Sequence, residues 1–418
     1  MALVERFLAA QVDELMPEER ALLIQGPRAV GKTTLLERIG AIHDRPIIDL
    51  ADDLVRAVAA EDVRSYFSGL PRPILIDEYQ RLPTVLNAVK HIVDHEEACG
   101  IFVLTGSTTA DLLPRGTDSL AGRLHDFTLW GLSQGELAGQ QEAFTDTAFL
   151  DPTSMRGQGH VTESRTDYVR ISARGGFPEA VLREKEEAGA RWLRSYASRV
   201  VERDLAEVVK LRHPAVLLQV MHSCMTRTAQ VFNVSDVCND LGQSKDIVSR
   251  YVDLLERVFV IERLPAYSRN RVTRLARHPK LHAVDTGLAL AIAQMNSTAL
   301  QRSPHFGAIL ESFVIGEIRK QLGWAKTPFR MFHFREHNHA EVDLVLESGD
   351  GRVVGIEVKS AAGVRRTDLR GLQRLAELTG PDFVHGFVLY TGGAGIQLGD
   401  DPRFSALPVS ALWRTVAG

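Results

Sequence analysis

The chain has 418 residues, a formal net charge of −4, 44% hydrophobic residues and 24% charged residues. This length exceeds one ordinary hydrophobic core and predicts roughly two to four domains. The composition is that of a soluble globular protein. Because the net charge is negative, any contact with nucleic acid has to come from local basic patches.

The cysteines and the apolar runs indicate where such a chain works. Cys99, Cys224 and Cys238 lie far apart in the sequence, which argues against a disulfide framework and against a cysteine-based zinc site. The amino-terminal segment MALVERFLAAQVDELMPEER carries acidic side chains and no uninterrupted apolar run, unlike a secretory signal. No apolar run approaches the length that a bilayer span requires. We therefore expect a cytoplasmic protein without membrane contact.

The segment of residues 21–36, ALLIQGPRAVGKTTLL, predicts a buried strand, a glycine-bounded loop and a helix that begins at Lys32. It matches G-x-x-x-x-G-K-[ST], the phosphate-binding loop. Its main-chain N–H groups can form an anion nest, and the helix N-terminus behind the loop adds partial positive charge. Lys32 can then reach the β- and γ-phosphates of ATP, and Thr33 can hold Mg²⁺. The residues predicted to bind the nucleotide are Gly26, Pro27, Arg28, Ala29, Val30, Gly31, Lys32, Thr33 and Thr34.

Residues 1–140 alternate strand-like and helix-like segments at short spacing. A short amphipathic helix is expected within residues 1–20 and another helix at 51–68, with strands at 21–25, 46–50, 73–77, 101–105 and 127–132. Such alternation predicts a parallel sheet with helices on both faces and a phosphate site at the carboxyl ends of its strands.

Two further strands of this domain end in polar residues. The run PILID ends in Asp77 and continues with Glu78, the Walker B pattern, in which Asp77 would hold Mg²⁺ and Glu78 would orient or activate the attacking water. After the next strand, Thr105 and Ser107 are candidates for sensing the γ-phosphate. A plain helix cap at Ser107 or Thr108 is the alternative.

Arg123 precedes the last of these apolar runs and is a candidate catalytic arginine. It could reach a phosphate of its own subunit or, in a homo-oligomer, that of a neighbour; a surface arginine is the alternative. Arg115 is a weaker candidate for the same role.

The middle of the chain has a different character. Residues 141–165 are polar and glycine-containing and predict a linker, and residues 166–212 predict a helical lid. Residues 213–300 predict three helices and a strand pair, which is the order of a winged helix. Residues 263–284 contain six Lys or Arg and no acid. This basic stretch predicts contact with phosphates, and a module for packing or protein interaction is the alternative.

Residues 301–418 predict a helix followed by three successive strands. Asp343, Glu357 and Lys359 stand at the spacing D-x13-E-x-K, and Glu357 and Lys359 share one face of a strand. The two carboxylates could hold Mg²⁺ or Mn²⁺, with Lys359 positioning a water and Glu311 adding a carboxylate. The alternative is a fold that keeps these residues for stability. The nearby His333, His337 and His339 are interpreted as a solvated loop.

Taken together, these motifs resemble a family of bacterial and archaeal AAA+-type P-loop ATPases with a carboxyl-terminal domain of undefined function. The stretches that carry the resemblance are GPRAVGKTTL, ILIDEYQRLP, VLTGS, LAGRL, LWGLSQGEL, GGFPEAV, ERDL, LESFV, EVDLVLE and IEVKS. In that family Arg28 and the run Asp77–Pro83 recur. The resemblance implies ATP binding and Mg²⁺-dependent hydrolysis by Lys32, Thr33, Asp77 and Glu78.

The last domain is similar to restriction-endonuclease-like PD-(D/E)xK folds, with Val342 where a proline is familiar. The predicted fold is therefore an α/β P-loop domain, a helical and winged-helix region, and a nuclease-like α/β domain. The predicted function is an ATPase that couples its nucleotide state to binding or remodelling of DNA or RNA. An ATP-regulated nuclease and a nucleotide-switched protein-interaction regulator are the alternatives.

Overall fold

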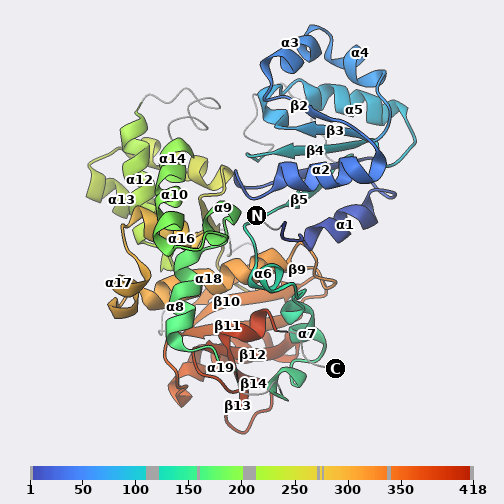
Figure 1. Ribbon diagram of the computed structural model, residues 1–418. Coiled ribbons are helices and arrows are strands. Elements are labelled where there is room, and N and C mark those ends of the chain that lie inside the picture. The colour runs from blue at the N-terminus through green and yellow to red at the C-terminus, as the bar shows by residue number, and fades with distance from the viewer. Residues whose placement is uncertain are drawn as a thin grey trace. The chain divides into compact units, whose positions relative to one another are not determined.

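The computed structural model describes residues 3–109, 122–157, 161–200, 213–270, 274, 277–336 and 340–414 (Figure 1). The chain divides into two compact units. The first comprises Met1–Leu132 with Arg257–Phe259, and the second comprises Ser133–Glu256 with Val260–Gly418.

The first unit is built on a five-stranded sheet with the strand order β2-β3-β4-β1-β5, in which all neighbouring strands run parallel. The short apolar runs of the sequence form these strands, namely β1 (Ala21–Gln25), β2 (Ile47–Asp49), β3 (Ile74–Asp77), β4 (Phe102–Gly106) and β5 (His125–Thr128). Figure 1 shows helices against both faces of this sheet. The predicted P-loop parallel sheet is therefore confirmed.

The helices of this unit are α1 (Leu8–Leu15), α2 (Lys32–His43), α3 (Asp53–Glu61), α4 (Val63–Ser68) and α5 (Val85–His95), with a short 3-10 helix at Tyr79–Arg81. Helices α3 to α5 bury apolar side chains such as Phe67 and Val89 in one core with Leu23 and Ile76 of the sheet. The predicted helix over 51–68 is two helices, because the Asp62 side chain accepts from the N–H of Ser65 and begins a new helix there.

The second unit begins with α6 (Gln134–Ala138), α7 (Phe144–Leu150) and a 3-10 helix at Ser154–Gly157. The prediction of a linker over 141–165 is therefore wrong. The Phe144 ring lies 5.5 Å from that of Phe387, and the indole of Trp324 donates to the carbonyl of Glu142 at 3.0 Å. The prediction failed because the stretch is polar on average, whereas a few apolar side chains anchor it to the carboxyl-terminal sheet.

Helices α8 (Arg165–Arg174), α9 (Pro178–Val181) and α10 (Glu186–Arg199) follow, and α16 (Thr286–Ile292) and α17 (Ser297–Arg302) join them from later in the chain. Helix α16 packs against both α8 and α10 and is buried over most of its length. The Thr286 hydroxyl donates to the carbonyl of Ser172 at 2.6 Å, and Asp285 accepts from the N–H of Gly176 at 2.6 Å. Residues 201–212 of the predicted lid lie outside the described residues.

Between these helices the chain forms α12 (Pro214–Thr226), β6 (Gln230–Val231), α13 (Val234–Leu241), α14 (Lys245–Arg257), β7 (Ile261–Leu264) and β8 (Lys280–Ala283). Strand β8 lies between β6 and β7 and is antiparallel to both. The predicted three helices and strand pair are present. Strand β6 is too short to leave a pattern in the sequence.

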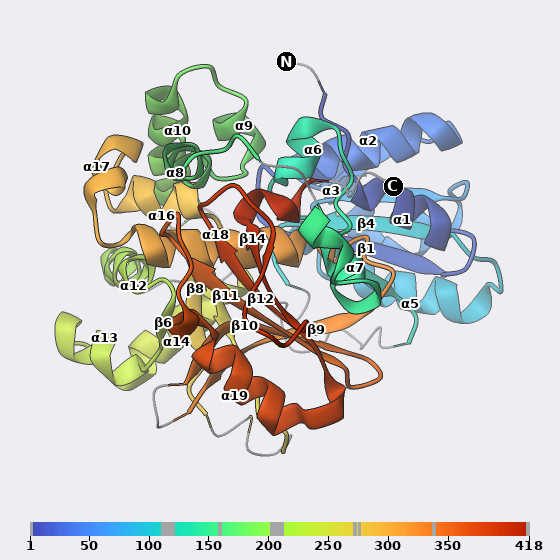
Figure 2. The same cartoon turned by 90° about the horizontal axis from the view of Figure 1, so that it is seen from below.

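The carboxyl-terminal part is a six-stranded sheet with the order β13-β14-β12-β11-β10-β9. Figure 2 shows its strands between α18 (Phe306–Gln321) and α19 (Arg370–Thr379). Its strands are β9 (Phe329–Arg335), β10 (Glu341–Ser348), β11 (Val353–Lys359), β12 (Phe383–Tyr390), β13 (Ile396–Gln397) and β14 (Phe404–Pro408), and 3-10 helices cover Arg366–Leu369, Gly380–Asp382 and Val409–Leu412. Over the described residues, no helix combines the length and the apolar character that a membrane span needs.

Candidate functional site

The loop between β1 and α2 has the backbone conformation that the glycine spacing predicts. Gly26 and Gly31 adopt positive φ angles of 148° and 100°, and Ala29 between them has a φ of 59°. A Cβ atom on Gly26 would lie 2.1 Å from the carbonyl oxygen of Leu129, so a side chain cannot be accommodated there. The loop therefore depends on Gly26 both for its turn and for the close approach of the segment after β5.

Lys32 begins α2 and is almost fully buried. Its ammonium group donates to the carbonyls of Gly26 and Pro27 at 2.9 and 2.7 Å. These bonds hold the positive charge at the centre of the loop. They also mean that the ammonium group must exchange loop carbonyls for phosphate oxygens when a nucleotide binds.

Arg6 is a residue of this site that the motif did not reveal. Its guanidinium donates to the carbonyl of Val30 at 2.5 Å and to that of Trp130 at 2.7 Å. It therefore ties the phosphate loop to the segment that follows β5. No local pattern marks an arginine so far upstream of the loop carbonyl that it binds.

Thr33 and Asp77 meet at the carboxyl end of the sheet. The Thr33 hydroxyl donates to Asp77 Oδ2 at 2.7 Å, and the Thr105 hydroxyl donates to the other carboxylate oxygen, Oδ1. Asp77 also accepts from the N–H of Glu78 at 3.0 Å. Thr105 thus orients the Walker B aspartate, a more specific role than the predicted sensing of phosphate.

Glu78 and Ser107 are joined through Gln80. The Gln80 amide donates to the Ser107 hydroxyl at 3.0 Å and to the Glu78 carboxylate, and Ser107 lies 3.4 Å from the same carboxylate oxygen. Glu78 has a positive φ of 54°, which is uncommon for a residue with a side chain and recurs at functional sites. Gln80 was not predicted as a site residue, although the D-E-x-Q run that contains it was visible in the sequence.

Arg123 does not join this group. It forms an ion pair with Asp94 near the end of α5, and it precedes β5, whose His125 pairs with Leu22 at the amino end of β1. The phosphate loop leaves the opposite, carboxyl end of β1. This position does not support the prediction that Arg123 reaches a phosphate of its own subunit, and a role towards a neighbouring subunit stays a prediction. Arg115 lies outside the described residues.

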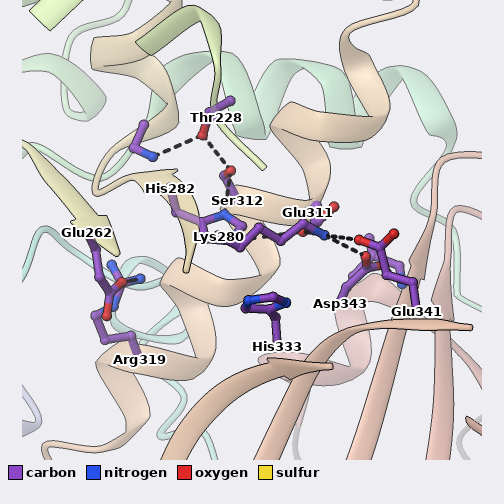
Figure 3. Close-up of polar contacts among 12 residues, drawn as sticks. Thr228, Glu262, Lys280, His282, Glu311, Ser312, Arg319, His333, Glu341 and Asp343 are labelled. Carbon is purple, nitrogen blue, oxygen red and sulfur yellow. Dashed lines mark hydrogen bonds and ion pairs between the residues drawn. The ribbon is translucent and has the colours of Figure 1, made fainter. Parts of the chain in front are cut away.

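The second predicted site lies in the carboxyl-terminal sheet, and the structure brings its residues together. Asp343 accepts from the N–H of Val358 at 2.9 Å, across the β10–β11 ladder, and Lys359 donates to Glu357 at 2.5 Å. Glu311 of α18 joins them through Lys280 of β8, which was not predicted. The Lys280 ammonium lies 2.6 Å from Glu311 and 3.1 Å from Asp343 (Figure 3).

The charges of this cluster affect one another strongly. Burial raises the pKa of Glu311 and of Glu357, the latter to about 8, and the neighbouring Asp343 charge adds to both shifts. Burial alone would lower the pKa of Lys280, but the charges of Asp343, Glu311 and Glu341 outweigh burial and raise it. Among the described residues, no group of three or more His, Cys, Asp or Glu has an arrangement that would hold a metal ion. The prediction of Asp343 and Glu357 as metal ligands is thus not supported in this arrangement, because an ammonium group stands among the carboxylates.

Several basic side chains of residues 263–284 pair with acidic side chains inside the fold. Arg263 pairs with Asp253 and Glu256, and Arg274 forms a buried double ion pair with Glu347 at 2.7 and 2.8 Å. With Lys280, three of its six basic side chains are thereby held by acids. These ion pairs do not support the predicted contact with phosphates for these three side chains.

The histidine group near β9 gives no metal site in the described residues. His333 is buried, its Nε2 lies 3.1 Å from the carbonyl of His278, and burial lowers its pKa to about 4. His333 is therefore a core residue and not part of a solvated loop. His337 and His339 lie outside the described residues.

Comparison with known protein families agrees with the first of these two sites. Residues 18–138 match the family model described as "AAA domain". Together with the sheet order and the phosphate loop, this match gives residues 18–138 the fold of a P-loop nucleotide-binding domain, similar to AAA domains. Residues 165–299 and 306–412 match models described as "Domain of unknown function", DUF8612 and DUF4143. The predicted boundary between lid and winged helix at residue 213 thus falls inside one family domain.

Two curated relatives extend the likeness beyond single domains. They are "Uncharacterized protein Rv2008c" of Mycobacterium tuberculosis and "Uncharacterized protein Mb2031c" of Mycobacterium bovis. Each is 29% identical over 361 residues, which cover 86% of this chain and 74% of the relative.

Solved structures with weaker likeness include the Thermotoga maritima RuvB Holliday junction branch migration motor. It is 17% identical, and the alignment covers 65% of this chain and 92% of that chain with a TM-score of 0.27. AMPPCP-bound DnaA from Aquifex aeolicus is 10% identical over 60% of this chain and 86% of that chain, with a TM-score of 0.23.

Proposed function

We propose that the protein is a Mg²⁺-dependent ATPase whose nucleotide state controls binding or remodelling of nucleic acid. The observation that carries the ATPase proposal is the 2.7 Å contact between the Thr33 hydroxyl and Asp77, beside a glycine-bounded loop with Lys32 at its centre. Oxygen atoms of a hydroxyl and a carboxylate are the ligands that Mg²⁺ prefers. The residues present therefore fit a Mg²⁺–ATP complex, with Thr33 and Asp77 as the groups that would hold the metal.

Each residue of the chain then has a distinct task. Mg²⁺ supplies neutralisation of charge on the phosphate oxygens when it is bound. Lys32 binds the β- and γ-phosphates, and the main-chain N–H groups of residues 28–34 surround them. Glu78 orients the attacking water and accepts its proton, while Gln80 fixes the position of the Glu78 carboxylate.

Release of phosphate from ATP by the purified full chain tests this proposal. Lys32→Ala should reduce the rate by at least about a hundredfold, because the phosphate oxygens would lose the Lys32 ammonium in both the ground state and the transition state. Removal of divalent cations by a chelator should stop turnover. Lys185→Ala removes an exposed lysine of the second unit and should leave the rate unchanged. Full activity of Lys32→Ala would refute the proposal.

The nucleic-acid part of the proposal is supported by the order of elements from α12 to β8. Three helices followed by a strand pair, with β6 added beside β8, is the order of a winged helix. Lys245 and Arg250 are exposed on α14, the helix that follows the Gly242 turn, and Arg277 is exposed before β8. If α14 contacts phosphates, DNA or RNA should change the ATPase rate, and Arg250→Ala should weaken this effect and its dependence on salt.

A nucleotide-switched protein-interaction regulator is the second candidate. It is favoured by the ion pairs of Arg263, Arg274 and Lys280, which withdraw half of the basic stretch from any phosphate. An ATPase rate indifferent to DNA and RNA, together with a defined protein that is recovered only in the presence of ATP, would favour this candidate. The nuclease predicted from the sequence is not proposed, because Lys280 stands among the carboxylates that would hold its metal.

A further inference from the structure

Acidic side chains from a helix and a strand converge on one buried lysine in the second unit. The Lys280 ammonium nitrogen lies 2.6 Å from Glu311, 2.9 Å from Glu341 and 3.1 Å from Asp343. Only 3% of the Lys280 side chain is exposed. Figure 3 shows this side chain extending from β8 towards the acids of α18 and β10.

The ammonium group stands where a cation held by these carboxylates would stand. Three carboxylate oxygens surround one positive centre, as they would around a hard divalent cation, whose oxygen ligands lie at about 2.0–2.6 Å. The distances from Lys280, 2.6 to 3.1 Å, lie at or above the upper end of that range, as N–H···O contacts do. Two positive centres cannot share this position, so the lysine and a metal ion exclude each other.

Glu357 has a buried carboxylate oxygen that could still contact a further positive charge. Its Oε1 accepts from Lys359, whereas its Oε2 is buried and, within the described residues, has no hydrogen-bond partner. Only 9% of Glu357 is exposed. Four carboxylates, including Glu341, thus face the ammonium groups of Lys280 and Lys359, and one buried carboxylate oxygen is left without a donor.

We propose that Glu311, Glu341 and Asp343 form a latent divalent-cation site for Mg²⁺ or Mn²⁺, in which the Lys280 ammonium is the resident cation. While Lys280 stays in place, these carboxylates bind no metal ion. The inference does not depend on the ATPase proposal, since it concerns other residues and another unit of the chain.

The origin of Lys280 makes this arrangement a link between two family domains. Lys280 belongs to β8, which is paired on both sides by β6 and β7, within the domain of residues 165–299. The carboxylates belong to the domain of residues 306–412. A residue of one domain therefore decides whether the carboxylates of the other can accept a metal ion.

Titration of the full chain with Mn²⁺ alone, without nucleotide, tests the proposal through the free Mn²⁺ signal in electron paramagnetic resonance. Lys280→Met keeps much of the side-chain volume and removes the charge. This variant should bind one Mn²⁺ per chain that the wild type does not bind. Its dissociation constant should be at least about tenfold lower than that of any Mn²⁺ bound by the wild type, and a tenfold difference corresponds to ~1.4 kcal/mol of binding free energy. Adding Asp343→Asn to this variant should remove the gain. Lys359→Met is the matched control, because it removes one charge from the same cluster and leaves Lys280 in place.

Thermal unfolding gives a second readout that also covers a poorly folded variant. Lys280→Met leaves three carboxylates without their cation, so its melting temperature should fall, and Mn²⁺ should raise it again or restore folding. The wild type should show no such dependence on Mn²⁺. The proposal is overturned if Mn²⁺ neither binds nor stabilises Lys280→Met. It is equally overturned if the wild type binds a Mn²⁺ and Asp343→Asn, introduced alone into the wild type, abolishes this binding.

Discussion

Replacing Gly26 by alanine tests whether the phosphate loop works through the close approach between residue 26 and the segment after β5. The new Cβ atom would lie 2.1 Å from the Leu129 carbonyl oxygen, against an ordinary carbon–oxygen contact of roughly 3.3 Å. The loop and the segment after β5 must therefore separate by about 1 Å. The atoms involved belong to the main chain, so no change of rotamer can relieve the contact.

A displacement of this size should act mainly on activity. Misplacement of a binding group by about 1 Å can cost roughly a hundredfold in rate, so kcat/KM for ATP should fall by about that factor. Overpacking of this kind typically destabilises a fold by about 1–3 kcal/mol. Phosphate release and thermal unfolding measure the two effects separately.

Gly139→Ala is the matched control for backbone strain. Gly139 also has a positive φ, 68°, but an added Cβ would have no atom of the described residues within 4 Å. This variant should lose about 1–2 kcal/mol of stability and keep its ATPase rate. A Gly26→Ala protein with the kcat/KM of the wild type would refute the role assigned to the approach of Leu129.

Three further substitutions test the chemistry and the packing. Glu78→Gln should still bind ATP but hydrolyse it about 10²–10⁴ times more slowly, because the amide is a poor proton acceptor; equal hydrolysis would exclude Glu78 as the base. Gln80→Leu should lower kcat by about tenfold with little change in KM, whereas an equal change in KM would indicate a role in nucleotide binding instead. Arg274→Met should destabilise the second unit by about 3 kcal/mol in chemical unfolding, because among the described residues it leaves the buried Glu347 with only the half-exposed Arg330 as an ion-pair partner. A loss below about 1 kcal/mol would show that this ion pair is not stabilising.

The parts of the fold that could be predicted are those in which contiguous residues determine the geometry. The phosphate loop is such a case, since its glycines, Lys32 and the helix start occupy a few consecutive positions. Thr33 and Asp77 are far apart in the sequence, yet their contact follows from one rule, that parallel strands bring their carboxyl ends to the same edge of a sheet. The same rule places Arg123 at the amino edge of the sheet, away from the phosphate loop, because this residue precedes its strand.

The contacts that could not be predicted join residues without any shared local pattern. Counting basic residues in 263–284 assumes that all of them face solvent. Arg274 instead packs against the adjacent rings of Tyr267 and Phe332, whose centroids lie 4.7 and 4.6 Å from its guanidinium carbon. Lys280 reaches acids that lie much further along the chain, on α18 and β10. The linker prediction failed for a related reason, since a few aromatic anchors outweigh many polar neighbours.

The position of α16 between α8 and α10 determines how the middle of the chain would respond to a protease. A backbone cut within residues 201–212 would break the covalent connection between α10 and α12, but it would leave the buried face of α16 in contact with both earlier helices. The two pieces should therefore elute together from a sizing column and separate only in denaturant. Expressed alone, a piece that begins at residue 213 would present the apolar side of α16 to water and should aggregate.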